Sequence, residues 1–315
     1  MLRFRPALTA CGWLLLAALS STSASATTLS VAVRSPATSD PSSIESVGDI
    51  DDIAELNPNL TPVEVGIGFT SITSVFVDAR NGVLKGYAGF DRQTATDDPS
   101  AAPYSYAMGT LGAAGYLTGS GSAPVSVTIA LSFDGSFAAT AGSPYLNFLG
   151  TLVGGSTNSP TYISQISFYD DGEGVMVEEI AQQTITNGNI TTESPYAGAT
   201  PTVFSATREL LAGEVRITFD ALPGELISFG ASLYGVAVAE IDEDTGGYLP
   251  SSGAVDFRHT GMLSIYVPQG YGFESDASLL QNVVQQVPEP ATWLSMLVGL
   301  GLLGFTARRG ALPGG

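Results

Sequence analysis

The amino-acid sequence predicts an all-β protein, an antiparallel β-sandwich of the jelly-roll type, with an N-terminal signal peptide and one C-terminal transmembrane helix. Three observations lead to this fold class. Short segments between residues 63 and 287 alternate apolar and polar residues with a period of two. Turn-forming residue pairs separate these segments, and no long run in this region has the period and caps of a helix. Many short strands with closely spaced turns are typical of sandwiches.

Residues 1–26 are predicted to be a secretory signal peptide. Two arginines precede an apolar run over residues 7–19, and Ala24 and Ala26 then form an A-x-A cleavage site. We therefore expect the secretion machinery to recognise this segment and the mature protein to begin after Ala26. The only cysteine, Cys11, lies inside the signal peptide, so the mature protein is expected to have no thiol and no disulfide.

The exported part of the chain is strongly acidic. Residues 27–290 hold 7 basic residues and all 30 acidic residues, which gives this segment a net charge of −23. Nucleic acids and anionic lipids are bound through lysine and arginine, so the charge argues against both as partners. The same charge favours solubility and attracts divalent cations.

Two segments that flank the sandwich domain are predicted to lie outside it. Residues 27–62 form an acidic lead-in that is rich in serine and proline. Because large apolar residues are few there, we expect loose order with a short helical turn near residues 50–56. Residues 276–287 are predicted to be a polar spacer between the domain and the C-terminal tail.

The sandwich domain is predicted over residues 63–275. Its clearest strand covers residues 125–133, where odd-numbered residues are apolar and even-numbered residues are small or polar. One face of this strand is expected to meet a core and the other to meet solvent. Similar patterns predict strands at residues 28–33, 72–77, 83–90, 145–153, 162–169, 175–180, 203–208, 215–219, 226–240, 254–257 and 262–267. The turn pairs between strands are Asn81-Gly82, Asp134-Gly135, Asp171-Gly172, Asn187-Gly188 and Pro223-Gly224.

Catalytic residues are hard to assemble from this sequence, and we expect a protein that is not an enzyme. His259 is the only histidine, whereas zinc sites usually need two or three histidines or thiolates. A Ser-His-Asp triad with Asp256 lacks the G-x-S-x-G elbow. Glycoside hydrolysis needs only two carboxylates, which the acidic residues leave open. Aromatic residues that would hold a sugar are spread out along the sequence, and this argues against that class of enzyme.

Two acidic loops are candidate calcium ligands, and no other cofactor is expected. The first loop, residues 242–247, offers Asp242 and Asp244, and the second is the predicted hairpin turn over residues 170–173. Calcium takes carboxylate and carbonyl oxygens from such loops, although neither follows the D-x-D-x-D-G pattern. The alternative is that both loops are solvated acidic turns.

The C-terminal tail, residues 288–309, has three parts in a fixed order. Pro288, Glu289 and Pro290 come first, the uncharged apolar run 291–307 follows, and Arg308 and Arg309 come last. The prolines favour extended backbone, which a processing enzyme can grip. The apolar run is just long enough for a transmembrane helix. The positive-inside rule holds the arginine pair in the cytoplasm and leaves the preceding chain on the far side of the membrane.

These three parts closely resemble the PEP-CTERM sorting signal of Gram-negative envelope proteins. The resemblance implies an exosortase, a membrane protease or transpeptidase that removes the tail during export. Residues 255–261, which contain a D-F-x-x-T stretch, lead to the P-x-G turn at residues 268–270. This second stretch is similar to the last strand pair of many small PEP-CTERM β proteins, and it names no activity.

The resulting expectation is an exported, non-enzymatic envelope or extracellular-matrix protein. An exosortase would sort and process it, from an inner-membrane-anchored precursor to a mature form at the cell surface or outside the cell. The family resemblance further implies association with exopolysaccharide and biofilm. Two alternatives stay open at this point, a calcium-dependent carbohydrate-binding module and a polysaccharide-modifying enzyme.

Overall fold

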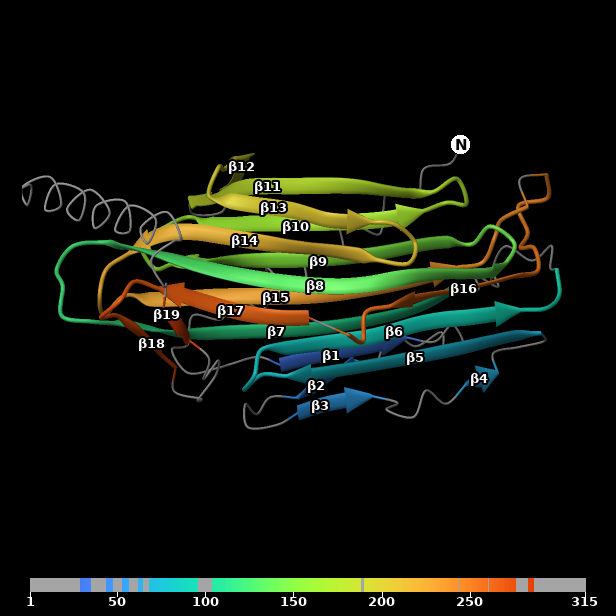
Figure 1. Ribbon diagram of the computed structural model, residues 1–315, viewed down its shortest axis with the longest axis horizontal. Coiled ribbons are helices and arrows are strands. Elements are labelled where there is room, and N and C mark those ends of the chain that lie inside the picture. Colours follow the sequence, from blue (N-terminus) through green and yellow to red (C-terminus); the bar gives the residue numbers. More distant parts are fainter. Residues whose placement is uncertain are drawn as a thin grey trace, which may run out of the picture.

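The computed structural model shows a β-sandwich. It describes residues 29–34, 44–47, 53–56, 62–64, 68–95, 104–187, 190–242, 244–259, 261–275 and 283–285, which form two sheets. The long strands of both sheets run along the long axis of the molecule, and one sheet lies in front of the other in Figure 1. No helix occurs among the described residues. The predicted all-β class with antiparallel sheets is therefore confirmed.

The rear layer in Figure 1, sheet A, has the strand order β12-β11-β10-β9-β15-β7-β1-β2, and β18 also pairs with β7. Its strands are β1 (Leu29–Arg34), β2 (Ile44–Val47), β7 (Tyr104–Thr118), β9 (Tyr145–Ser156), β10 (Thr161–Asp170), β11 (Val175–Asn187), β12 (Ile190–Pro195), β15 (Leu226–Val238) and β18 (Gly272–Glu274). Each of its described pairings is antiparallel. The centre of the sheet is β9 and β15, which pair over their whole length.

The front layer, sheet B, follows the order β13-β14-β8-β16-β6, with β5 beyond β6 and both β3 and β4 paired to β5. Its strands are β3 (Ile53–Leu56), β4 (Val63–Glu64), β5 (Phe69–Asp78), β6 (Val83–Arg92), β8 (Val125–Ala141), β13 (Ala199–Ala206), β14 (Leu211–Ala221), β16 (Ser251–Asp256), β17 (Gly261–Val267) and β19 (Val283–Gln285). Successive strands β16 and β17 pair with different halves of β8. They behave as one interrupted strand beside it.

The core lies between the two sheets and is built from alternate residues of each strand. On β8, Val127, Ile129 and Leu131 are fully buried, as the period of two predicts. Phe133 lies edge-on to Phe148 of sheet A, with ring centroids 5.4 Å apart. Aromatic pairs of this kind add about 0.5–1.5 kcal/mol beyond the area they bury.

Glycines of sheet A make room for aromatic rings of sheet B. A Cβ atom on Gly150 would lie 2.3 Å from Cε1 of Phe133, and one on Gly235 would lie 2.7 Å from Cε1 of Phe257. Both distances are shorter than any contact between real carbon atoms. Neither position can therefore hold a side chain unless its neighbours move. Part of the high glycine content therefore serves close sheet packing and not turns.

Most of the predicted turn pairs separate strands. Asn81-Gly82 joins β5 to β6, Asp171-Gly172 joins β10 to β11, and Pro223-Gly224 joins β14 to β15. These glycines have φ values of 67°, 102° and 82°, a region that favours glycine. Strands β11 and β12 pair from Asn187 and Ile190 onward, which confirms the fourth hairpin, although Gly188 itself lies outside the described residues.

The predicted turn at Asp134-Gly135 is wrong. Both residues lie inside β8, which continues without a break to Ala141. A Cβ atom on Gly135 would lie 2.8 Å from the backbone oxygen of Asp256, so this glycine permits a close approach of the neighbouring strand. An Asp-Gly pair looks the same in the sequence whether it forms a hairpin turn or lies inside a strand. Only the pairing with neighbouring strands distinguishes the two cases.

The lead-in and the spacer contribute strands to the sheets. From the lead-in, β1 pairs with β7 and β3 pairs with β5, so the expected helical turn is wrong for residues 53–56. From the spacer, β19 pairs in parallel with β17. In each case, backbone groups find a partner strand that is distant in sequence, and local composition does not reveal such a partner.

Candidate functional site

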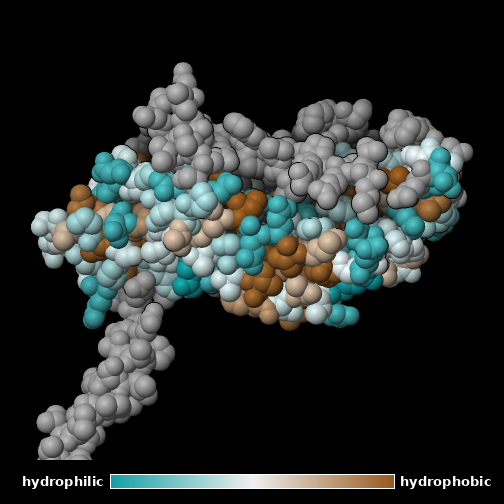
Figure 2. Space-filling view, turned by 90° about the horizontal axis from the view of Figure 1, so that it is seen from above, coloured by the Kyte–Doolittle hydropathy of each residue, from teal (hydrophilic) through white to brown (hydrophobic). Residues whose placement is uncertain are grey.

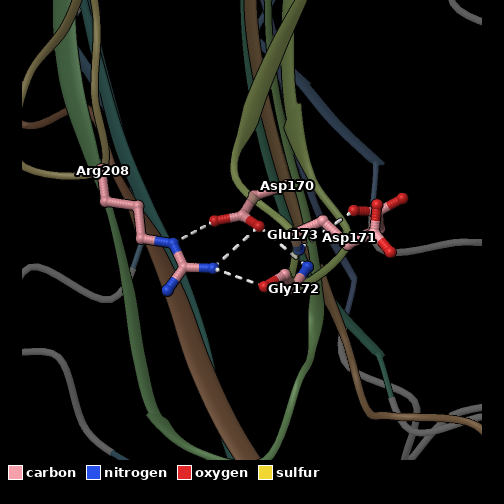
Figure 3. Close-up of polar contacts among 5 residues, drawn as sticks. All are labelled: Asp170, Asp171, Gly172, Glu173 and Arg208. Atoms are coloured by element: carbon pink, nitrogen blue, oxygen red, sulfur yellow. Dashed lines mark hydrogen bonds and ion pairs between the residues drawn. The ribbon is translucent and has the colours of Figure 1, made fainter.

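An ion pair at the acidic hairpin after β10 connects the two sheets. The Asp170 side chain is 1% exposed and forms an ion pair with Arg208, which follows β13. Arg208 Nη2 donates to Asp170 Oδ1 at 3.0 Å and to the Gly172 carbonyl oxygen at 3.3 Å. Figure 3 shows the carboxylates of Asp171 and Glu173 on the side of the hairpin away from Arg208. Asp170, the first carboxylate of the predicted hairpin turn over residues 170–173, is therefore already paired with Arg208.

The ion pair with Arg208 favours the ionised form of Asp170. Burial raises the pKa of Asp170, but the Arg208 hydrogen bond and the N–H of Gly172 outweigh burial, so the pKa lies below its usual value. The Gly172 N–H donates to Asp170 Oδ1 at 2.8 Å. Asp170 is thus a charged structural group in the folded protein.

The second acidic loop, after β15, is held by its own first residue. Asp242 Oδ1 accepts the N–H of Asp244 at 3.0 Å, and Oδ2 accepts the Thr245 hydroxyl at 2.9 Å. The Asp244 N–H, followed by Thr245, lowers the pKa of Asp242. In the described part of the chain, no group of three or more His, Cys, Asp or Glu residues is placed to hold a metal ion. Glu243 lies outside that part, and the calcium hypothesis stays a prediction.

Asp256, which a catalytic triad would use, is the last residue of β16. Its Oδ1 accepts Arg258 Nε at 2.9 Å, and its Oδ2 accepts Arg258 Nη2 at 2.5 Å. The guanidinium carbon of Arg258 lies 4.8 Å from the ring centre of Tyr87, a cation–π distance. A triad would need the hydrogen bond to Asp256 to come from His259, which is exposed. The described partner of Asp256 is therefore Arg258 and not His259.

A third partly shielded carboxylate, Glu225, joins two turns at the opposite end of the strands. It accepts hydrogen bonds from the Ser156 hydroxyl at 2.6 Å and from the N–H groups of Asn158 and Leu222, both at 2.8 Å. Burial raises the pKa of Glu225, yet these hydrogen bonds, led by Leu222, more than offset burial and lower it.

The side of the molecule where sheet A ends at β11 and β12 and sheet B ends at β13 has features that prevent pairing with other chains. Figure 2 looks onto this side of the molecule and shows apolar residues in separate patches among hydrophilic ones. Phe204, which is 65% exposed, lies in a bulge of β13 between Val203 and Ser205. Bulges and charged side chains on edge strands prevent pairing with other chains, and β11 carries Glu178 and Glu179. This edge is therefore protected against association.

The outer face of sheet A is uncharged along four of its strands, whereas Glu178 of the neighbouring β11 pairs with the outward Ser167 of β10. On β7, β9, β10 and β15 the core residues alternate with residues that point away from sheet B. None of these outward positions holds a charged residue. The outer face of sheet B is charged, and on β14 Arg216 Nη2 lies 2.6 Å from Glu214 Oε1.

Six of the 12 tyrosines lie on the outer face of sheet A. Tyr116 lies toward one end of the strands, and the other five, which we call the tyrosine face, lie toward the opposite end. They are Tyr104 and Tyr106 on β7, Tyr145 on β9, Tyr169 on β10 and Tyr234 on β15. The rings of Tyr104 and Tyr106 are stacked with centroids 6.3 Å apart, and Tyr106 lies 5.8 Å from Tyr234. All five side chains are partly exposed.

The strand register brings these tyrosines together. Tyr106 pairs with Val236, Val236 with Asn147, and Asn147 with Tyr169, which places all four in one row across the sheet. Sequence reasoning missed this cluster because the tyrosines are spread over 131 positions, from 104 to 234. The signal that was available is the absence of charge from every second residue of four strands.

The predicted processing residues lie outside the described part of the chain. These are Ala24, Ala26, Pro288, Glu289, Pro290, Arg308 and Arg309, together with the apolar run 291–307. Within the described part, no helix is long and apolar enough to cross a membrane.

The C-terminal segment matches a known family model. Residues 286–310 match the PEP-CTERM protein-sorting motif, which confirms the resemblance drawn from the sequence. No curated protein and no solved structure matches the chain. The motif implies an exported, membrane-anchored precursor that an exosortase sorts and processes for the cell surface.

Proposed function

We propose that this chain is a non-enzymatic envelope or extracellular-matrix protein that associates with exopolysaccharide after an exosortase has processed it. The observation that carries the proposal is the sorting motif at residues 286–310. A protein with a removable tail can leave the inner membrane, and its mature domain then acts where it is released. The signal peptide over residues 1–26 and the strongly acidic exported part support the same route.

The roles of the shielded carboxylates support a non-enzymatic domain. Asp170 and Asp256 each bind an arginine, and Glu225 holds two turns together. A general acid or base needs a carboxyl group that is available to a substrate. These three groups instead stabilise loops, so the polysaccharide-modifying alternative would have to use other carboxylates.

The sorting role is tested by replacing Pro288, Glu289 and Pro290 with alanine together. The apolar run and the arginine pair remain, so the precursor should still insert, but the extended peptide that the protease grips is lost. In a host with a matching exosortase, we expect full-length protein to accumulate in the inner-membrane fraction. Immunoblots of fractionated cells measure this accumulation.

The matched control carries Gln281→Ala and Asn282→Ala, which lie before the matched motif. It should be processed and exported like the original protein. Normal processing of the triple-alanine variant would refute the sorting role of the tripeptide. Matrix association is tested separately, by asking whether mature protein moves from the matrix fraction into the medium when exopolysaccharide synthesis is deleted.

A further inference from the structure

We infer that one end of the sandwich lies against the lipid headgroups of the inner membrane while the sorting tail is still attached. This end, which we call the turn end, lies at the left in Figure 1. The inference rests on the membrane-anchored precursor that the sorting motif implies, and it goes beyond sorting because it assigns a lipid-binding surface to the folded domain. The turn end consists of the turns over residues 119–124, 157–160, 222–225 and 268–271.

Strand pairing brings these four turns together. The Gly224 N–H donates to the Leu117 carbonyl oxygen at 2.7 Å, and the Thr157 N–H donates to the Leu226 carbonyl oxygen at 3.0 Å. β18 pairs with the last residues of β7, which places the fourth turn beside the first. The turn end is therefore one surface, although its members come from four separate parts of the sequence.

The sorting tail leaves the domain at the turn end. β19 pairs in parallel with β17, and its last residue, Gln285, is opposite Val267, the residue before the fourth turn. The apolar run 291–307 begins six residues after Gln285, and six extended residues span at most about 22 Å. β8 alone has 17 residues, which corresponds to about 55 Å. The bilayer that holds the apolar run is therefore closer to the turn end than to the opposite end.

The turn end carries little of the negative charge of the protein. Glu225 is the only acidic or basic residue in its four turns, and this residue is 8% exposed and accepts three hydrogen bonds. Two exposed carboxylates, Asp220 and Glu274, lie behind the turns on β14 and β18. The acidic loops over residues 170–173 and 242–247 lie at the opposite end, many times the Debye length of about 8 Å away. The turn end can thus approach anionic lipid, which repels the molecule as a whole.

The exposed side chains of the turn end suit the headgroup region of a bilayer. Leu222 is 39% exposed, and Tyr116, on the outer face of sheet A at this end, is 40% exposed. The partly exposed Tyr271 ring packs against the first turn, where a Cβ atom on Gly121 would lie 2.2 Å from the tyrosine hydroxyl oxygen. Tyrosines concentrate at membrane–water interfaces because the ring is apolar and the hydroxyl group is polar. Leu222 adds an apolar group that can enter the same region.

Weak affinity is sufficient for this contact, because the tail already holds the domain at the membrane. A tether converts binding into an intramolecular step with a high effective concentration. When the exosortase removes the tail, that advantage is lost, and the acidic domain separates from the membrane. The contact therefore belongs to the precursor and does not oppose release.

The test places the precursor, with its tail, in nanodiscs that contain no exosortase. The lipids are phosphatidylcholine, phosphatidylglycerol and a fraction with a nitroxide quencher on the headgroup. Cys11 is the only cysteine and lies in the predicted signal peptide, so an introduced cysteine is the only thiol of the exported precursor. Ser122→Cys labels the turn end, and Ser143→Cys, between β8 and β9, labels the opposite end at an equally exposed serine. We expect a fluorophore at residue 122 to be quenched and one at residue 143 to stay bright.

Variants of the Ser122→Cys protein separate contact from tethering. Leu222→Asp should lower the equilibrium constant of the contact about tenfold and remove most of the quenching, because it replaces apolar burial with a carboxylate beside anionic lipid. Ala123→Asp, in the neighbouring turn, is a second variant with the same expected loss. The matched control is Leu210→Asp, at a leucine that is 46% exposed in the turn after β13, and it should be quenched like the original. Melting temperatures confirm that each variant is folded.

Three results would overturn the inference. The first is that the label at residue 122 is not quenched. The second is equal quenching at residues 122 and 143, which would mean that the domain lies flat on the bilayer. The third is that folded Leu222→Asp and Ala123→Asp are quenched as strongly as the original, which would show that the tether alone brings this end close. The nanodiscs contain no exosortase, so these results refute the contact alone, whereas normal processing of the triple-alanine variant refutes the sorting role.

Discussion

At the residue scale, the folded state depends on a few charged side chains that are shielded from water. Asp170 is the clearest case, because its side chain is 1% exposed and its charge is balanced by Arg208. Removal of Arg208 leaves the buried Asp170 carboxylate without its ion-pair partner, and the Gly172 N–H remains as a donor to Oδ1. The pair also joins two sheets that share no backbone hydrogen bonds at this point, so its loss affects how the layers are held together.

We predict that Arg208→Ala lowers the free energy of unfolding at pH 7 by about 1–3 kcal/mol, the usual cost of an unsatisfied buried group. In the original protein the Asp170 pKa is lowered, so the stability from its ionised form is present at neutral pH and is lost as pH falls through the folded-state pKa. The variant lacks that contribution, so the difference between the proteins should shrink toward pH 3. Urea unfolding at both pH values measures it.

The double variant Arg208→Ala with Asp170→Asn is the control for this prediction. It removes the uncompensated charge and should recover part of the lost stability. A stability difference for Arg208→Ala that is the same at pH 7 and pH 3 would show that the arginine acts through packing and not through the Asp170 charge.

At the scale of elements, two features of the strands and loops have measurable consequences. Glycine faces phenylalanine across the two sheets, as at Gly150 and Phe133, and leaves room for the ring. The acidic loop after β15 is closed by hydrogen bonds to Asp242. The first feature concerns packing between layers, and the second concerns what a solvated loop can bind.

We predict that Gly150→Ala destabilises the domain by about 1–3 kcal/mol, the range for overpacked cores. The added Cβ would lie 2.3 Å from Phe133 Cε1, so the ring or the strand must move. Combining it with Phe133→Leu should cost less than the sum of the single changes, because the smaller side chain vacates that space. Additive effects in urea unfolding would contradict the contact.

The calcium hypothesis for Asp242 and Asp244 predicts that millimolar calcium raises the melting temperature more than sodium at equal ionic strength. Asp242→Asn keeps an acceptor oxygen for the loop but removes the charge, so calcium should no longer stabilise that variant. If the original protein melts at the same temperature in both salts, the loop is a solvated turn.

At the scale of the whole molecule, the sequence predicts well what depends on neighbouring residues. The alternation in residues 125–133 identified a core strand, and Asn81-Gly82 identified a hairpin, because both signals are local. Asp134-Gly135 failed because its glycine serves a neighbouring strand. The tyrosine face depends on which strands pair and in what register. Tyr106 and Tyr169 lie in one row because β15 and β9 pair between their strands.

The parallel pairing of β19 with β17 limits how far the sorting tail can reach. β19 ends at Gln285, and Pro288 lies three residues later. Three extended residues span at most about 11 Å, whatever path they take. While β19 stays paired, Pro288 is thus held within about 11 Å of the end of that strand. A bulky membrane enzyme must then either fit against that sheet or act after the last strand has detached. In the second case, the lifetime of one short strand pair sets the timing of release from the membrane.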